Sequence, residues 1–416
     1  MSLQISEKVR ALGVQAQADL SEQFARIDAI AEFNTQKILA AFQNHRVSES
    51  YFAGTTGYGY DDLGRDRLDA IFAEIFGTED ALVRIGFVNG THAISCALFG
   101  ALKPGETLVS AVGAPYDTML GVIGITDKGP GSLRQYGIHY KQVDVTAEGR
   151  PDLDGIVAAV QDSTVSTVLI QRSRGYATRP SLSVNEIGAL CEAIKRANPN
   201  VSILVDNCYG EFVEEQEPTQ VGADLVVGSL IKNPGGGLAP TGGYIAGRRD
   251  LVEAASMRLT TPGIGRECGS TLGNNRLLYQ GLFLAPHTVA QALKTAVFGA
   301  RIMELLGYQT DPASSEVRRD IIQMIHFGEP EGLKKFCRGI QKGAPVDSYV
   351  VPEPWEMPGY DCPVIMAAGA FIQGSSIELS ADAPMREPYT LYLQGGLTYE
   401  SGKSGILLAV EELLNN

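Results

Sequence analysis

The sequence lacks the features of a membrane-spanning or nucleic-acid-binding chain. Its 416 residues contain no apolar run of about 18 residues, the length that a helix needs to span a bilayer. The 34 Lys and Arg are outnumbered by 48 Asp and Glu, and the net charge of −14 argues against nucleic-acid or anionic-membrane partners. Residues 1–8 show no basic region followed by an apolar stretch, so we expect no signal peptide and a cytoplasmic protein.

Residues that bind metals are few and scattered. None of the six cysteines lies within four positions of another, so the paired spacing of zinc sites is absent. The five histidines are equally dispersed and form no H-E-x-x-H motif. We therefore predict no metal site, and we expect most of the cysteines to be small core residues in a reducing compartment.

Short apolar runs alternate with helical patterns between residues 80 and 250. We predict strands at 81–85, 107–111, 138–143, 165–170, 201–205, 224–228 and 243–246, and helices at 91–102, 116–124, 152–161, 183–197 and 250–258. This alternation is typical of an α/β fold, in which helices cover both faces of a mostly parallel sheet, here of seven strands. Ligands of such folds bind beyond the carboxyl ends of the strands.

The remaining segments have a different character. Residues 1–45 carry helical patterning, 46–66 form a glycine-tyrosine segment, and helical spacing resumes at 68–76. After a long helix at 274–306 we predict a helix at 313–326, strands at 347–351, 363–372, 375–380 and 388–395, and a last helix at 403–414. We therefore divide the chain into an amino-terminal arm with the glycine-tyrosine segment (1–66), a large α/β domain (67–285) and a small α+β domain (286–416).

Lys232 and Asp206 follow two of the predicted strands. Asp206 ends the apolar run 201–205, and Lys232 stands in Ser229-Leu230-Ile231-Lys232, just before the glycines 235–237. A lysine can hold an aldehyde cofactor as a Schiff base, and a carboxylate can keep a pyridine nitrogen protonated. This pair predicts pyridoxal phosphate (PLP) as the cofactor.

A phosphate-binding turn is predicted upstream of this pair. Asn89, Gly90 and Thr91 lie between the predicted strand 81–85 and the predicted helix 91–102. Backbone N–H groups at the start of a helix bind phosphate, and Gly90 lets the backbone approach closely. The hydroxyl of Thr91 could add a hydrogen bond, and so could that of Ser229, three residues before Lys232.

The order of these motifs resembles that of fold-type-I PLP enzymes of the sulfur amino-acid group, the cystathionine and methionine lyases. Four segments look most like the methionine γ-lyase-like branch, which is often named for aluminium resistance. They are GYGYDD at 57–62, VDNCYGEF at 205–212, GSLIKNPGGG at 228–237 and QGGLTYE at 394–400. The similarity extends over nearly the whole chain, and the segment around Lys232 is its most specific part.

The resemblance implies a role for each matching residue. Lys232 would form the Schiff base, Asp206 would pair with the pyridine nitrogen, and Gly90 and Thr91 would cradle the phosphate with help from Ser229. Tyr116 would stack on the cofactor, although a tyrosine that only packs at a helix start fits the pattern equally well. Tyr58 would cross a subunit interface to the neighbour's phosphate, which implies a homodimer or homotetramer; alternatively, its loop only packs.

The sequence departs from the family at the arginine that grips the substrate carboxylate. The matching strand, 390–395, contains no arginine. Arg386, just upstream, is the nearest replacement, and Arg172 and Arg174 follow another predicted strand. The planar fork of arginine suits a carboxylate. A salt bridge at the protein surface is the alternative role for each of the three, and we favour it for at least one of them.

We therefore predict a PLP-dependent lyase that eliminates a β- or γ-substituent, carried through sulfur, from an amino acid and releases a keto acid and ammonia. Lys232 would remove the α-proton while Asp206 stabilises the charged ring. Transamination, aldol cleavage and racemisation use the same two residues and stay open. A regulatory protein that keeps the fold without catalysis is the remaining alternative.

Overall fold

In the computed structural model, which describes residues 3–127, 129–357 and 362–415, the chain divides into two compact units. Residues 35–283 form the large unit, and residues 1–34 with 284–416 form the small unit. Helices α2 (Ser21–Asn44) and α9 (Asn275–Leu305) each contribute residues to both units. The division of the sequence at residues 66 and 285 stays a prediction.

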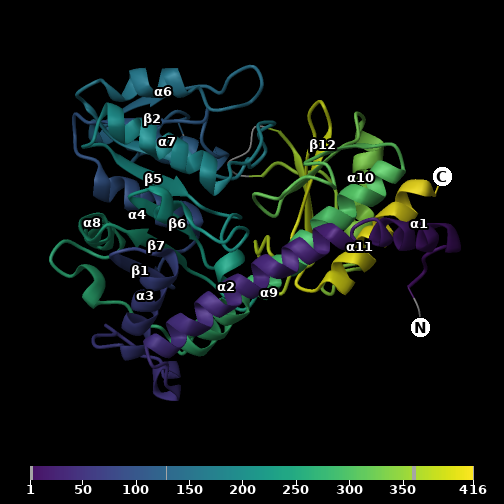
Figure 1. The fold of residues 1–416 in the computed structure, drawn as a ribbon, viewed down its shortest axis with the longest axis horizontal. Helices are drawn as coiled ribbons and strands as arrows, with labels where there is room; N and C mark the ends of the chain where they lie inside the picture. Colours follow the sequence, from purple (N-terminus) through teal and green to yellow (C-terminus); the bar gives the residue numbers. More distant parts are fainter. Residues whose placement is uncertain (1–2, 128, 358–361, 416) are drawn as a thin grey trace. The chain divides into compact units, whose positions relative to one another are not determined.

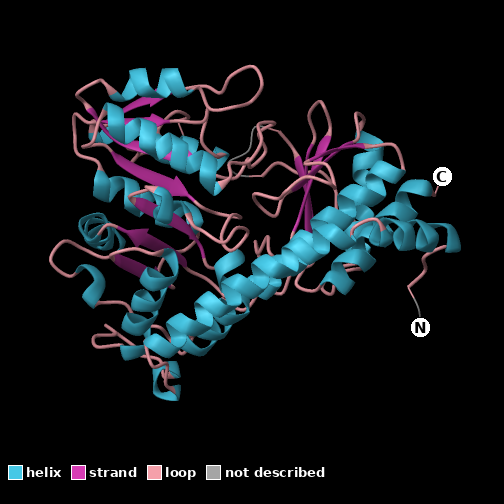
Figure 2. Cartoon of the chain, viewed as in Figure 1, coloured by secondary structure: helices cyan, strands magenta, loops and turns pink. Residues whose placement is uncertain are grey.

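The large unit is built on one seven-stranded sheet (Figures 1 and 2). The strand order is β1-β7-β6-β5-β4-β2-β3. Strand β7 runs antiparallel to β1 and β6, and the other neighbours pair in parallel. The strands are β1 (Asp80–Arg84), β2 (Thr107–Ser110), β3 (His139–Gln142), β4 (Val165–Gln171), β5 (Ser202–Asp206), β6 (Leu225–Ser229) and β7 (Gly243–Gly247). The predicted α/β class, with its mostly parallel sheet, is confirmed.

Helices connect these strands and cover both faces of the sheet. The α-helices are α3 (Leu63–Phe76), α4 (Gly90–Ala101), α5 (Asp117–Ile123), α6 (Leu153–Val160), α7 (Val184–Ala197) and α8 (Arg249–Leu259). Short 3₁₀ turns are η1 (Glu49–Phe52), η2 (Arg134–Tyr136), η3 (Pro218–Val221), η4 (Asn233–Gly235) and η5 (Gly265–Glu267). None of the helices in the described ranges is both long and apolar enough to cross a bilayer.

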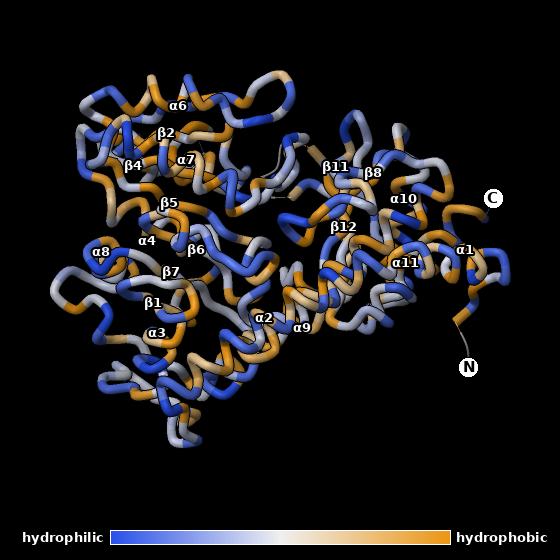
Figure 3. The backbone as a smooth tube through the Cα atoms, in the orientation of Figure 1, coloured by the Kyte–Doolittle hydropathy of each residue, from blue (hydrophilic) through white to orange (hydrophobic). Residues whose placement is uncertain are grey.

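Alternation of side chains along the strands produces two cores. Leu204 on β5 and Ile245 on β7 point to one face, where they pack with α4, α5 and α8. Tyr244 points the opposite way and contacts Phe72 and Phe76 of α3. Both faces are therefore apolar, and Figure 3 shows hydrophobic residues along the strands of this sheet.

The small unit combines an antiparallel sheet with helices. Its strand order is β10-β11-β12-β9-β8. The strands are β8 (Gln309–Asp311), β9 (Gln323–His326), β10 (Val364–Ala368), β11 (Ser380–Pro384) and β12 (Thr390–Gln394). Its helices, besides parts of α2 and α9, are α1 (Glu7–Ala18), α10 (Pro330–Lys342) and α11 (Tyr399–Leu414). The predicted antiparallel α+β character of this region is confirmed.

Three predicted elements of the small unit are wrong. The predicted helix at 313–326 is instead a loop followed by β9, because residues 320–325 are all buried and residues 323–326 pair as an inner strand between β8 and β12. The predicted strand at 347–351 is an exposed loop without a partner strand. The predicted strand at 375–380 is mostly turn, and β11 begins only at Ser380.

Candidate active site

Five strands end along one edge of the large sheet. Gly243 on β7 pairs with Arg84, the last residue of β1, and with Ser229, the last residue of β6. Asp206 ends β5 and pairs with Gln171, the last residue of β4. Parallel pairing brings the end of β2 to the same edge. The residues that follow these strands therefore converge, as the sequence predicts for a ligand site.

Three of these strand ends meet at Gly90. A Cβ atom added to this glycine would lie 3.3 Å from Cβ of Ser229 and 3.4 Å from Sγ of Cys208. The start of α4 therefore packs directly against the last residue of β6 and against a residue that follows β5. Any side chain larger than hydrogen at position 90 would crowd this junction, so the predicted need for glycine has a steric cause.

The start of α4 offers hydrogen-bond donors for an anion. Asn89 is the N-cap, and its Oδ1 accepts a 2.8 Å hydrogen bond from the backbone N–H of His92. Oγ1 of Thr91 lies 2.7 Å from Oγ1 of Thr118 on α5, which brings a second hydroxyl to the helix start. A helix of 12 residues presents free N–H groups and a partial positive charge at this end.

Ser229 presents a buried hydroxyl at the same junction. Its side chain is 1% exposed. Its Oγ has no hydrogen-bond partner among the residues that the structure describes. A buried hydroxyl without a partner is unfavourable, so the chain by itself does not account for its presence.

Asp206 lies at the end of β5 in a half-buried position. Burial raises the pKa of its carboxyl group, and Lys232 and the hydrogen bonds from Cys208 oppose that rise. The backbone N–H of Cys208 donates to Oδ1 at 3.1 Å. This bond fixes one carboxylate oxygen and orients the group at the edge of the sheet.

Lys232 follows β6 in the tight turn that leads into η4, and its amine faces an aromatic ring. Nζ lies 4.1 Å from the centre of the Tyr209 ring. Burial by itself lowers the pKa of Lys232, but the acidic groups around it outweigh burial and raise the pKa above 10.5. Burial also raises the pKa of the Cys208 thiol, which is neutral near pH 7. Asp206 is therefore a neighbour whose charge stabilises the ammonium form.

Tyr116 lies in the connection after β2, where it is the N-cap of α5. Its backbone N–H donates to Oε1 of Gln171 at 2.7 Å. Its ring contacts Tyr176 edge to face, with ring centres 6.0 Å apart. A Cβ atom on Gly175 would lie 3.0 Å from its ring, so this glycine makes room for it. The geometry fixes the ring beside the edge that carries Asp206, and its stacking role stays a prediction.

The three candidate arginines have different environments. Arg172 is fully buried and pairs with Glu214 at 2.8 Å and with Glu217 at 3.6 Å. Arg174 is also buried. Arg386 is exposed in the turn between β11 and β12 of the small unit. The guanidinium of Arg172 is already paired with two carboxylates. Arg172 therefore forms ion pairs with other protein residues, and these pairs lie in the interior and not at the surface.

Tyr58 is 72% exposed and stacks on Tyr60, with ring centres 5.5 Å apart. The turn that carries it is held by Arg65, whose Nη1 donates to the carbonyls of Gly59 at 2.6 Å and Gly269 at 2.8 Å. The loop is therefore anchored while the ring stays accessible. Its predicted reach to a neighbouring subunit stays a prediction.

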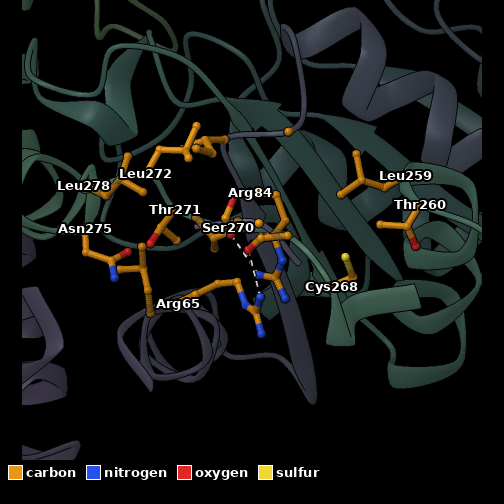
Figure 4. A pocket seen from close by; sticks show the side chains of 16 residues that line it. Arg65, Arg84, Leu259, Thr260, Cys268, Ser270, Thr271, Leu272, Asn275 and Leu278 are labelled. Atoms are coloured by element: carbon orange, nitrogen blue, oxygen red, sulfur yellow. Dashed lines mark hydrogen bonds between the residues drawn. The ribbon is translucent and has the colours of Figure 1, made fainter. Parts of the chain in front are cut away.

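A cavity of about 380 Å³ lies beside this turn in the large unit (Figure 4). Its polar lining includes Arg65, Arg84 and Thr271. Arg84 pairs with Asp69 at 2.7 Å, and Arg65 is bound to carbonyls, so neither cation is left for an anion. The cavity contains none of the predicted site residues, and we assign no ligand to it.

Sequence reasoning missed several residues at the site. Thr118, Tyr209 and Glu211 were not predicted, although the last two follow Asp206 closely. Arg179 was also missed; its Nη2 donates to the carbonyls of Gln171 at 2.7 Å and Ser173 at 2.9 Å, which fixes the loop after β4. In the sequence, only their position shortly after Asp206 indicated Tyr209 and Glu211, and no sequence feature indicated Arg179.

Comparison with known proteins agrees with this geometry. The family model described as methionine gamma-lyase matches residues 9–414. The chain belongs to the methionine gamma-lyase family. The resemblance predicted from the four sequence segments is therefore confirmed.

Individual proteins match this chain over nearly its full length. The uncharacterized protein YnbB of Bacillus subtilis is 49% identical over 98% of this chain and 97% of its own length. The crystal structure of a carbon-sulfur lyase involved in aluminum resistance from Clostridium novyi is 53% identical, with a TM-score of 0.95 over 99% of this chain and 97% of that one. The pyridoxal-5'-phosphate-dependent protein YhfS of Escherichia coli, at 18% identity and a TM-score of 0.62 over 93% of this chain and 96% of that one, shares the fold.

Proposed function

We propose that the chain is a PLP-dependent lyase that cleaves a carbon–sulfur bond of an amino acid by β- or γ-elimination and yields a keto acid and ammonia. The junction at Gly90 carries the proposal, because it joins the predicted phosphate turn to the strand ends that bear Asp206 and Ser229. Membership of the methionine gamma-lyase family supports the same chemistry.

The residues present fit the cofactor. Ser229 has a buried hydroxyl without a protein partner among the described residues, and Gly90 lets the start of α4 pack closely against the strand end that carries this hydroxyl. Gly90, Thr91 and Ser229 would hold the phosphate, with Asn89 fixing the helix start. Asp206 would hold a proton on the ring nitrogen, Tyr116 would lie against the ring, and Lys232 would hold the aldehyde.

PLP, when bound, supplies an electron sink for the carbon that loses its proton. The chain's own residues direct that chemistry. Asp206, once it shares a proton with a ring nitrogen, places less net negative charge beside Lys232, which lowers the pKa of the amine and leaves more of it in the free form that can accept a proton. Lys232 is then the group that accepts the α-proton and returns it. The orientation of Asp206 by Cys208 N–H keeps its carboxylate fixed throughout.

The test is a visible absorbance spectrum of the purified protein before and after borohydride, followed by a screen of sulfur amino acids. We expect a visible band that borohydride removes, a covalent label on the Lys232 peptide, and keto-acid release without an added amino acceptor. The absence of any band after addition of PLP would overturn the proposal in favour of a non-catalytic protein. A strict need for an amino acceptor would replace elimination by transamination.

Replacing Ser229 by alanine is expected to affect cofactor binding and stability differently. The free energy of unfolding of the cofactor-free chain should change by less than about 1 kcal/mol, because the hydroxyl that is lost has no partner. The affinity for PLP should fall roughly tenfold to a hundredfold, since hydrogen bonds to charged groups contribute about 1.5–3 kcal/mol. Urea denaturation and a titration of the visible band measure the two effects. Equal affinity in both proteins would remove Ser229 from the phosphate site.

We also propose that the protein assembles into a closed dimer or tetramer in which Tyr58 completes a neighbour's site. The exposure of an anchored aromatic ring supports this proposal. We expect Tyr58→Phe to keep its assembly and to weaken PLP binding roughly tenfold, through loss of a hydroxyl to phosphate. Sedimentation and the same titration measure both. A fully active monomer would contradict the proposal.

A further inference from the structure

Glu211 is a buried carboxyl group that the proposed chemistry does not use. It lies in the connection after β5 and is 0% exposed. Its Oε1 accepts a 2.9 Å hydrogen bond from the Tyr244 hydroxyl on β7. Its Oε2 has no hydrogen-bond partner in the part of the chain that the structure describes. Burying a carboxyl group that is not fully bonded is costly, so packing alone does not account for it.

Glu211 is joined to the turn that carries Lys232. Its backbone carbonyl accepts a 3.0 Å hydrogen bond from Nδ2 of Asn233, the residue next to Lys232. On the preceding strand, a Cβ atom added to Gly228 would lie 2.5 Å from Oε1 of Glu211. Glu211 therefore contacts both the end of β6 and the turn that follows it.

The charge on Glu211 depends on the groups that face it. These are Tyr244 from β7, Glu217 and Cys208 from its own connection, and Lys232 from the turn after β6. Burial raises the pKa of Glu211 to about 8; its backbone hydrogen bond opposes this rise, Glu217 adds to it, and Tyr244 and Lys232 oppose it. The carboxyl group is therefore mostly neutral at pH 7 and becomes an anion above about pH 8.

We propose that Glu211 is a positioning residue that fixes the Lys232 turn through Asn233 and, while it is neutral, limits the negative charge around the Lys232 amine. The inference rests on the proposed function, in which that amine must give up a proton. Ionised Glu211 stabilises the ammonium form, so less of the amine is present in the free form that can accept a proton. When Glu211 is neutral it no longer raises the pKa of Lys232, and Asp206 is the carboxylate that still does so.

The test is competitive labelling of Lys232 in the full chain, after bound aldehyde is removed with hydroxylamine. Acetic anhydride is the probe, and the Lys232 peptide is quantified by mass spectrometry at several pH values. We expect wild type and Glu211→Gln to label equally near pH 7. Well above pH 8 the variant should label roughly threefold faster or more, because it lacks the anion that raises the pKa of the amine. Glu106→Gln, the same change next to the amino end of β2, should follow wild type at every pH.

Two results would overturn the proposal. Identical labelling of wild type and Glu211→Gln at all pH values would show that the glutamate does not affect the amine. A constant offset, present also at pH 7, would show a displaced turn rather than an effect of charge. If Glu211→Gln does not fold, Tyr244→Phe is the second variant. It removes the hydrogen bond to Oε1 that favours the anion, so Glu211 should ionise, and begin to slow the labelling of Lys232, at a higher pH in this variant than in wild type.

A second measurement uses stability and requires neither cofactor nor activity. The pKa of Glu211 is raised from 4.5 to about 8 in the folded chain, so folding favours its neutral form. Its contribution to stability is fully present below pH 4.5 and is lost as the pH rises to about 8. Wild type should therefore lose stability relative to Glu211→Gln across this range. If the protein does not bind PLP but wild type and Glu211→Gln differ with pH as described, the proposed function is overturned. If the protein binds PLP but the two proteins do not differ with pH, only the role of Glu211 is overturned.

Discussion

Lys232→Ala is expected to lower kcat/KM for keto-acid release by roughly a thousandfold or more, the size of effect seen when a nucleophile or base is removed. The same variant should show no visible band that borohydride removes. The physical reason is that Lys232 holds its amine at the strand-end edge, where the charge of Asp206 stabilises the ammonium form. Steady-state kinetics and spectra of the purified variant measure both losses.

Lys232→Arg is the matched control for this prediction. It keeps a cation beside Asp206 but cannot hold an aldehyde or give up a proton at ordinary pH. We expect its stability to stay close to that of wild type and its activity to be as low as that of Lys232→Ala. Substantial activity in the arginine variant would mean that charge, rather than the amine, is what the site needs from this position.

Arg172→Ala is expected to lower the free energy of unfolding by about 3–5 kcal/mol, because it removes the buried cation that pairs with the carboxylates of Glu214 and Glu217. Glu217 is fully buried, and Asn207 would also lose the 2.9 Å hydrogen bond that Nη1 of Arg172 donates. Urea denaturation of the cofactor-free protein, followed by circular dichroism, measures the change. Asn207 adjoins Asp206, so a loss of PLP affinity should accompany the loss of stability.

Arg150→Ala is the control for the buried ion pair. Arg150 also pairs with a glutamate, Glu186, at 2.6 Å, but its side chain is 52% exposed. Its removal should cost less than about 1 kcal/mol, because water screens the pair. If Arg172→Ala instead kept its stability and only raised KM, Arg172 would bind the substrate carboxylate after all, and the ion-pair assignment would be wrong.

The large sheet could be predicted from the sequence because its strands are short, apolar and bounded by helices. The run 201–205 and the helix predicted at 183–197 illustrate this, since β5 (Ser202–Asp206) and α7 (Val184–Ala197) nearly coincide with them. Strands buried on both faces are continuously apolar and easily recognised. The motifs at their ends could be ordered along the chain for the same reason.

The small unit was harder to predict because its patterns admit two structures. The apolar residues near Ile321 and Ile325 fit a helix or a buried strand, and only pairing with β12 decides for the strand. Helix α10 was missed although Leu333, Phe336 and Ile340 recur at helical spacing and Glu329 caps its start. That helix could have been found, whereas β9 could not.

The sequence by itself determined the α/β class and which residues follow the strands, including Asp206, Ser229 and Lys232. Only the tertiary structure decided that Arg172 is committed to Glu217 and that Glu211 faces Tyr244. The physical reason is that hydrophobic periodicity is a local property of the chain. The partner of a buried charge comes from another strand or loop, so it is fixed only when the strands pair.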